Sequence, residues 1–312
     1  MIYHIGLPKC GSTTLQYIFA NSDHKFLGCN PKNCPSKFYH SKIGNFLEGP
    51  LRFGTNKSYF EKSNQIKTFI NDYSNKNNSK VILSYENISF RLTPWDLPTD
   101  IKFERLNKIL IPKSTILFCF RNVLDFLLSL YKNHVSFGYT ENLKYFIQEI
   151  IAIKDYGLLN DLNLENFFEL ISYHFKDHKV LLYNIDNRPD FSFLLNELNI
   201  KTNLDIIINQ NKSPLLHETE SIRVFNKSIQ NRKNLLGWLE SHRVFYKSNL
   251  EQDQIFEISR HRILQNKYLT EQDYINTSTQ NIKWPEEILD LERKNSFFLN
   301  NKSFPDNFKL LI

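Results

Sequence analysis

The sequence contains no apolar run that approaches the roughly 20 residues needed to cross a bilayer, so we expect no integral membrane segment. We also expect no signal peptide, because Ile2 already belongs to the first apolar segment. No internal repeat is present. The expected lack of a membrane segment and of a signal peptide predicts a cytoplasmic protein.

The chain also has only a small excess of positive over negative charge. The chain has 39 Lys and Arg residues against 33 Asp and Glu residues, which gives a net charge of +6. This mild positive charge suits an anionic ligand such as a nucleotide or an acidic glycan. It is too small and too evenly spread for binding to DNA, so we expect no nucleic-acid partner.

Cysteine is scarce, with only four residues: Cys10, Cys29, Cys34 and Cys119. Cys119 falls within an apolar segment and is expected in the core. Cys29 and Cys34 could pair, although an intracellular location favours free thiols. Their C-x₄-C spacing has no further ligands nearby and is a poor zinc signal. We therefore expect no metal.

Apolar segments that alternate with amphipathic ones predict an α/β fold, with a central parallel sheet flanked by helices. The expected strands are 2–6, 81–85, 115–120 and 179–183. The expected helices lie near 13–21, 58–74, 123–134, 141–154, 164–175 and 190–198.

The remaining segments complete a single domain over residues 1–312. Residues 22–57 are rich in Gly, Pro, Asn and Lys. They predict a long irregular connection, which could lie over a site for a substrate. A helical pattern with many Arg and Lys covers 215–247. From about 250 to 312 we expect a helical C-terminal addition.

The most informative segment begins at the first strand. Its apolar residues lead into a loop with Gly6 and Gly11, and then into a hydroxyl-rich helix start. A strand, such a loop and a helix N-terminus together make a phosphate cradle. The glycine spacing matches the Walker A loop G-x-x-x-x-G-K-[ST]. However, Ser12 stands where that loop has lysine, and Lys9 lies inside the loop. This argues against routine ATP or GTP hydrolysis. The alternative is a chance Gly-Ser-Thr turn before a helix.

The segment G-L-P-K-C-G-S-T-T-L-Q, from Gly6 to Gln16, resembles the 5′-phosphosulfate-binding loop of sulfotransferases, P-K-[ST]-G-[ST]-[ST]. Those enzymes use 3′-phosphoadenosine 5′-phosphosulfate (PAPS). Cys10 departs from the pattern, but its backbone N–H could still bind phosphate. The resemblance implies that Lys9 stabilises the leaving phosphate. The groups expected to bind the cofactor here are Lys9, Cys10, Gly11, Ser12, Thr13 and Thr14.

A second segment carries Arg121 at the end of a strand and Ser129 two turns into the next helix. Ligands bind at that strand edge in open α/β sheets, and the two side chains could clamp one phosphate. With Asp125 and Tyr131, they resemble the sulfotransferase 3′-phosphate motif R-[DN]-P-x-[DE] followed by S-x-[YF]. Val123 replaces the usual proline. The alternative is an arginine capping a strand and a serine on a helix surface.

The acceptor needs a base, and Glu86 follows the apolar strand 81–83. Several bacterial and glycan-type sulfotransferases resemble this chain in having S-x-E there. A carboxyl with a pKa of about 4.3 is ionised at neutral pH and can accept a proton. Alternatively, Glu86 caps a turn or pairs with a lysine. His134 is a reserve catalytic candidate, and His40 and Glu86 are candidates for acceptor binding.

A third resemblance is the N-x-S segment Asn211-Lys212-Ser213, which could equally be a surface turn. The motifs imply a bacterial sulfotransferase that moves the sulfuryl group of PAPS to a hydroxyl of a carbohydrate or glycolipid. The product is PAP, and no metal is required. The alternatives are a P-loop kinase of a nucleotide or small metabolite, and a non-catalytic nucleotide-binding protein. The position of Lys9 and the lack of a clear Walker B carboxylate count against the first. The presence of Lys9, Arg121 and Ser129 counts against the second.

Overall fold

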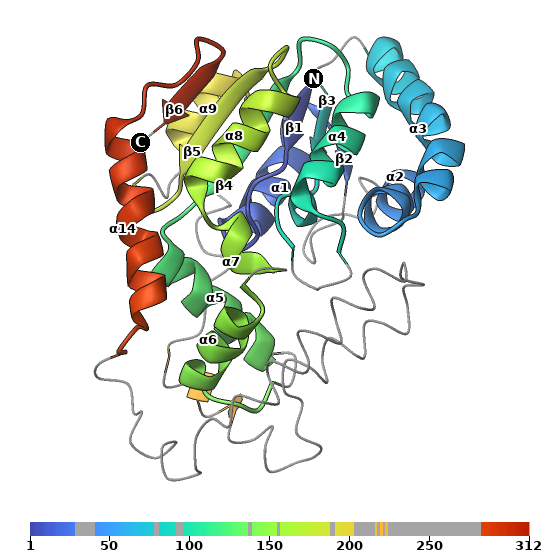
Figure 1. Ribbon diagram of the computed structural model, residues 1–312. Coiled ribbons are helices and arrows are strands. Elements are labelled where there is room, and N and C mark those ends of the chain that lie inside the picture. The colour runs from blue at the N-terminus through green and yellow to red at the C-terminus, as the bar shows by residue number, and fades with distance from the viewer. Residues whose placement is uncertain are drawn as a thin grey trace.

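Six parallel strands form one sheet, in the order β2-β3-β1-β4-β5-β6 (Figure 1). The computed structural model describes residues 1–28, 41–77, 81–91, 96–136, 139–154, 157–187, 191–202, 216, 219–220, 222–223 and 282–311. The strands are β1 (Ile2–His4), β2 (Lys25–Gly28), β3 (Val81–Ser84), β4 (Thr115–Phe120), β5 (Lys179–Asn184) and β6 (Phe308–Leu311).

Helices cover both faces of the sheet, with α4 and α8 in front of it and α1 and α9 behind it in Figure 1. Along the chain, the helical elements before β4 are α1 (Ser12–Ala20), α2 (Ser41–Phe46), the π-helix η2 (Leu47–Leu51), α3 (Asn56–Asn77), the 3₁₀ turn η3 (Glu86–Ile88) and α4 (Thr99–Ile109). Those after it are α5 (Val123–Ser136), α6 (Leu143–Ala152), α7 (Leu158–Asp161), α8 (Leu164–His174), α9 (Ser192–Leu198) and α14 (Glu286–Asn301).

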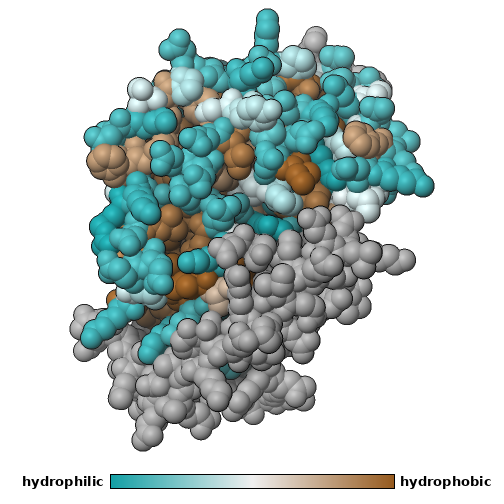
Figure 2. Space-filling model, viewed as in Figure 1, coloured by the Kyte–Doolittle hydropathy of each residue, from teal (hydrophilic) through white to brown (hydrophobic). Residues whose placement is uncertain are grey.

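Both faces of the central strands are buried, as expected for parallel strands covered by helices. Phe118 on β4 stacks on Phe167 of α8 with ring centroids 4.4 Å apart, and Phe103 of α4 meets the same ring at 5.4 Å. On another side of the core, the ring of His4 on β1 lies 5.9 Å from that of Phe19 on α1. Figure 2 shows that the outer surface of the described part is mostly hydrophilic in this view, with isolated hydrophobic side chains and one group of them beside the grey atoms.

The predicted α/β architecture with a parallel sheet is confirmed, and the four predicted strands match observed strands within two residues at each end. The irregular connection predicted over 22–57 is wrong for its described parts, which contain β2, α2 and η2. Strand β2 has only two apolar residues, Phe26 and Leu27. Its local pattern is too weak to indicate a strand, and its pairing with β3 decides its conformation.

The predicted helical C-terminal addition is not confirmed. The described part of that region holds one helix, α14, and then β6, which pairs in parallel with β5. This stretch therefore completes the sheet. The Asn211–Ser213 motif lies outside the described residues, as does nearly all of the predicted helical stretch 215–247.

The order of the strands places a switch point between β1 and β4. The chain leaves β1 towards β2 on one side of the sheet and leaves β4 towards β5 on the other. Ligands of open α/β sheets bind beyond the carboxyl ends of the strands at such a point. No helix in the described part of the chain combines the length and apolar character needed to span a membrane.

Candidate functional site

The loop between β1 and α1 is fixed against β4 by close backbone packing. The Leu7 amide donates to the Cys119 carbonyl at 2.8 Å. A Cβ on Gly6 would lie 2.6 Å from the Cys119 backbone nitrogen, so only glycine fits there. Lys9 and Gly11 have positive φ angles of 63° and 72°. A left-handed lysine is energetically costly and is typical of functional loops.

The amides of residues 10 to 14 converge at the start of the nine-residue helix α1. Within the described part of the chain, no hydrogen bond occupies these five N–H groups. The first intrahelical bond of this region is donated by Leu15 to the Gly11 carbonyl at 2.9 Å. Free amides at a helix N-terminus favour an anion, both by hydrogen bonding and through the helix dipole.

Helix α5 turns one polar face towards this loop. Asp125, Ser129 and Asn133 follow one another at four-residue spacing, so they share a face. The Lys9 Nζ donates to Asn133 Oδ1 at 2.9 Å, which ties the loop to the far end of this face. Arg121 lies 4.0 Å from Asp125 at its near end. Ser129 therefore lies between the two cations along the helix.

Arg121 stands at the carboxyl end of β4 and supports the same loop. Its Nη1 donates to the Lys9 carbonyl at 3.2 Å, and its Nη2 donates to Asp186 Oδ1 at 3.1 Å. Its Nε is buried and has no hydrogen-bond acceptor among the described residues. The hydroxyl of Ser129 also makes no hydrogen bond within the described structure. Both groups are therefore donors that a ligand could use.

Glu86 lies across the loop, at the carboxyl end of β3. Burial raises the pKa of its carboxyl, and the neighbouring Ser12 hydroxyl and the charge of Lys9 act in the opposite direction. The nearby charge of Glu48 raises this pKa further. The Oε2 atom is buried and has no donor within the described residues. Because an unsatisfied buried oxygen is costly, this atom fits a ligand that supplies a hydroxyl.

The other predicted loop residues contribute in different ways. The side chain of Cys10 is fully buried, and burial raises the pKa of its thiol. Only its backbone can therefore serve an anion. Ser12 is buried, with its hydroxyl donating to the Leu7 carbonyl at 3.4 Å, whereas Thr13 is exposed and Thr14 is partly exposed.

His134 is not brought to this group of residues. It lies on the buried face of α5, where its ring meets Phe146 at 5.3 Å and Tyr139 at 6.4 Å between centroids. Its Nδ1 is 2.9 Å from the Leu130 carbonyl, one helical turn earlier. Three further predictions, His40, Cys29 and Cys34, fall outside the described residues.

Sequence reasoning missed the partners that hold the two cations. Asn133 could have been found from its four-residue spacing after Ser129. Asp186 follows β5, the neighbour of β4, and its carboxylate binds both Arg121 and the Asn122 amide. Glu292 of α14 accepts from the Val123 amide at 2.6 Å. No local pattern could indicate that hydrogen bond, because Val123 and Glu292 are 169 positions apart in the sequence.

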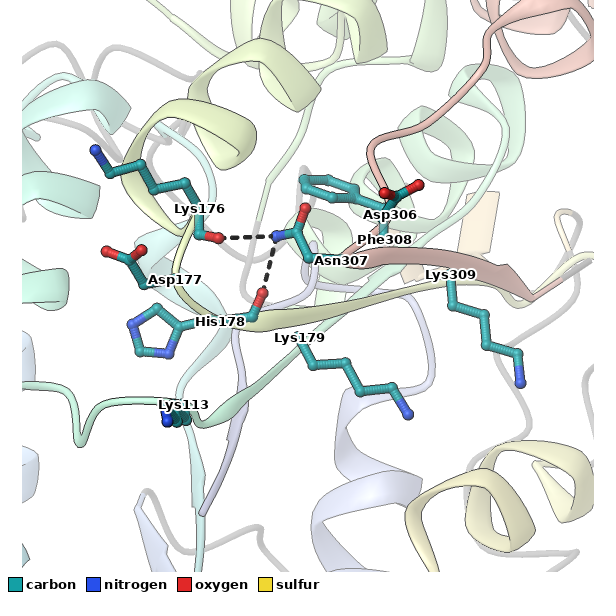
Figure 3. Close-up of a pocket in the computed structure, with 9 residues that line it drawn as sticks. All are labelled: Lys113, Lys176, Asp177, His178, Lys179, Asp306, Asn307, Phe308 and Lys309. Atoms are coloured by element: carbon teal, nitrogen blue, oxygen red, sulfur yellow. Dashed lines mark hydrogen bonds between the residues drawn. The ribbon is translucent and has the colours of Figure 1, made fainter.

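A separate pocket of about 560 Å³ lies at the opposite edge of the sheet, where β5 and β6 begin. Four lysines line it: Lys113, Lys176, Lys179 and Lys309. In the wall of this pocket, Asn307 Nδ2 donates to the backbone carbonyls of Lys176 and His178, at 3.3 and 2.9 Å (Figure 3). Lys179 and Lys309 both donate to Glu197, at 2.9 and 2.6 Å, which offsets their charge. This pocket takes no part in the site around Lys9.

Among the residues that the structure describes, no group of three or more His, Cys, Asp and Glu side chains is placed to hold a metal ion. Comparison of the chain with models of known protein families and with curated proteins gives no match.

Proposed function

We propose that this protein is a PAPS-dependent sulfotransferase that acts on a hydroxyl of a carbohydrate or glycolipid. One observation carries the proposal: around the β1–α1 loop, the described residues leave several hydrogen-bond donors and one carboxylate oxygen without partners, as a ligand with two phosphates and a neighbouring hydroxyl would require. Donors are the amides of residues 10–14, Arg121 Nε and Ser129. Glu86 Oε2 is an acceptor that no donor among the described residues occupies.

Two phosphates can be assigned to the two groups of donors. The amides of residues 10–14 would hold the 5′-phosphate of PAPS, as loop amides at a helix N-terminus hold phosphate in P-loop proteins. Arg121 and Ser129 would hold the 3′-phosphate, which ATP lacks. Asp186 already pairs with Arg121, so the guanidinium would share its charge between a carboxylate and the phosphate.

In the proposed reaction, Lys9 and Glu86 are the two side chains that act on the reacting atoms. The acceptor oxygen attacks the sulfur, and the bond between the sulfur and the bridging phosphate oxygen breaks. Its electron pair remains on the 5′-phosphate of PAP, where Lys9 offsets the developing charge. The acceptor proton passes to Glu86. Positioning and charge stabilisation account for the catalysis, as in phosphoryl transfer.

Binding of PAP tests the proposal most directly. At a hundred times its Kd, PAP should stabilise the fold by about 2.7 kcal/mol, measured as a rise in Tm. ADP and ATP, which lack the 3′-phosphate, should give little shift. Equal stabilisation by ATP would favour the kinase alternative, and no shift with PAP would reject the sulfotransferase.

Lys9→Ala should lower the rate of sulfuryl transfer by about 10²–10³-fold, the usual effect of removing one group that stabilises a developing negative charge. PAP affinity should fall much less, because the amides of residues 10–14 remain. Single-turnover transfer and PAP titration separate the two effects. Lys57→Ala, at an exposed position on α3, is the matched control. A variant that loses affinity and rate equally would assign Lys9 to binding alone.

A further inference from the structure

The π-helix η2 places a second carboxylate beside Glu86. Glu48 lies in this five-residue helix, which follows directly on α2. Asn87, the residue after Glu86, donates through Nδ2 to Glu48 Oε1 at 3.3 Å. Isolated π-helical turns occur frequently at functional sites. The contact joins η2 to the turn that carries the proposed base.

Glu48 is held by a rigid and largely buried support. Arg52 Nη1 donates to Glu48 Oε2 at 3.2 Å. The same guanidinium binds Asp96 through two hydrogen bonds, of 2.6 and 3.1 Å, and Asp96 is fully buried. Asp96 thus neutralises Arg52, and Glu48 remains the net negative charge of the trio. This arrangement fixes where the carboxylate points.

The carboxylate of Glu48 is only partly occupied by these contacts. Its side chain is 39% exposed, and its two hydrogen bonds to described residues use about two of the four lone-pair positions of a carboxylate. The remaining positions can accept from a ligand. Beside it, Glu86 Oε2 is buried and has no donor within the described residues. Two carboxylates that the described residues leave partly unoccupied are therefore close to each other.

We infer that Glu48 binds the acceptor substrate next to Glu86, and that the acceptor is an uncharged polyol such as a neutral sugar. This inference rests on the proposed sulfotransferase function. One hydroxyl donates to Glu48 while a neighbouring hydroxyl of the same sugar reaches Glu86. Two carboxylates at this position repel an anionic acceptor, so uronic acids and already sulfated sugars are disfavoured.

Transfer to matched sugars tests the acceptor class. With labelled PAPS, the para-nitrophenyl glycosides of glucose, galactose and mannose should be sulfated at least about tenfold better than the glucuronide, the discrimination expected from about 1.4 kcal/mol. Glucuronide differs from glucoside only by a carboxylate in place of a CH₂OH group. Equal or better transfer to glucuronide overturns the inference, as does a failure to sulfate any of the neutral glycosides.

Glu48→Gln tests the residue itself. The KM for a neutral glycoside should rise about tenfold, from the loss of a hydrogen bond to a charged group, and the discrimination against glucuronide should shrink. Stabilisation by PAP should be unchanged. Glu104→Gln, at an exposed position that pairs with Lys108, should behave as the wild type. If the KM is unaltered, Glu48 does not bind the acceptor.

A second measurement needs no activity. The charges that act on Glu86 are those of Lys9 from the loop and Glu48 from η2, and the Ser12 hydroxyl lies beside it. The thiols of Cys10 and Cys119 also lie near Glu86, but burial and the charge of Glu86 raise their pKa values and keep them neutral. Removing the charge of Glu48 should shift the Glu86 titration, followed by carboxyl ¹³C NMR, to lower pH. An unchanged titration overturns the placement of Glu48 beside Glu86. If the wild type does not bind PAP, the proposed sulfotransferase function is rejected, whatever the titration shows.

Discussion

Glu86→Gln should lower the rate of sulfuryl transfer by about 10²–10⁴-fold, the usual contribution of a general base, while PAP binding stays close to that of the wild type. The amide keeps the size of the side chain and can keep the contact with Ser12. It cannot take the acceptor proton. Single-turnover transfer and PAP titration on the same variant measure the two quantities.

The pH dependence of the wild-type reaction provides an independent check on Glu86. Burial raises the pKa of this carboxyl. The base form is lost as the pH falls through that raised pKa, so the acidic limb of the rate profile should lie above the range of an ordinary glutamate, about 4.3. The limb should disappear in Glu86→Gln.

Glu61→Gln, on the exposed surface of α3, is the matched control for this substitution. It should change neither the rate nor the profile. Transfer at the wild-type rate by Glu86→Gln would assign the proton to another group.

Gly6→Ala should have the largest effect on the fold of the site. The new methyl would lie 2.6 to 2.8 Å from the nitrogen, the Cβ and the carbonyl oxygen of Cys119. Two of these are backbone atoms of β4, so no flexible side chain can move aside. We expect a loss of about 1–3 kcal/mol of unfolding free energy, as for other overpacked sites, and the loss of detectable PAP binding because the loop is displaced. Chemical denaturation and the PAP thermal shift measure the two.

The chain offers a matched control in Gly49→Ala. A Cβ on Gly49 meets no atom within 4 Å. Because alanine is favoured over glycine in helices by up to about 1 kcal/mol, this variant should be as stable as the wild type or slightly more stable. PAP should bind it normally. If Gly6→Ala were equally well tolerated, the loop would not pack against β4 as described.

The sequence predicted the fold class and the strands that carry the site, because these strands are continuous apolar runs with strong local signals. β1, β3, β4 and β5 are of this kind. It failed for β2 and β6, which are short strands whose conformation depends on the neighbour each one pairs with. It also failed for η2, whose Pro50 and Gly49 give the pattern of a loop.

The sequence by itself determined that the Gly6–Gly11 loop and Arg121 would meet, since both follow buried strands and parallel strands end at a common edge. It also determined that Glu86 would lie at that edge, for the same reason. Each of these residues lies within a local strand-and-turn pattern that can be recognised in a single segment.

Only the tertiary structure decided how those residues are held. The contact of Lys9 with Asn133 spans 124 positions, and that of Arg121 with Asp186 spans 65. Glu48 reaches Asn87 from a helix that the sequence did not indicate. Hydrogen bonds of this kind depend on where separate elements pack, and no local pattern encodes them. They determine which donors and acceptors remain for a ligand, and the proposed chemistry depends on those unused groups.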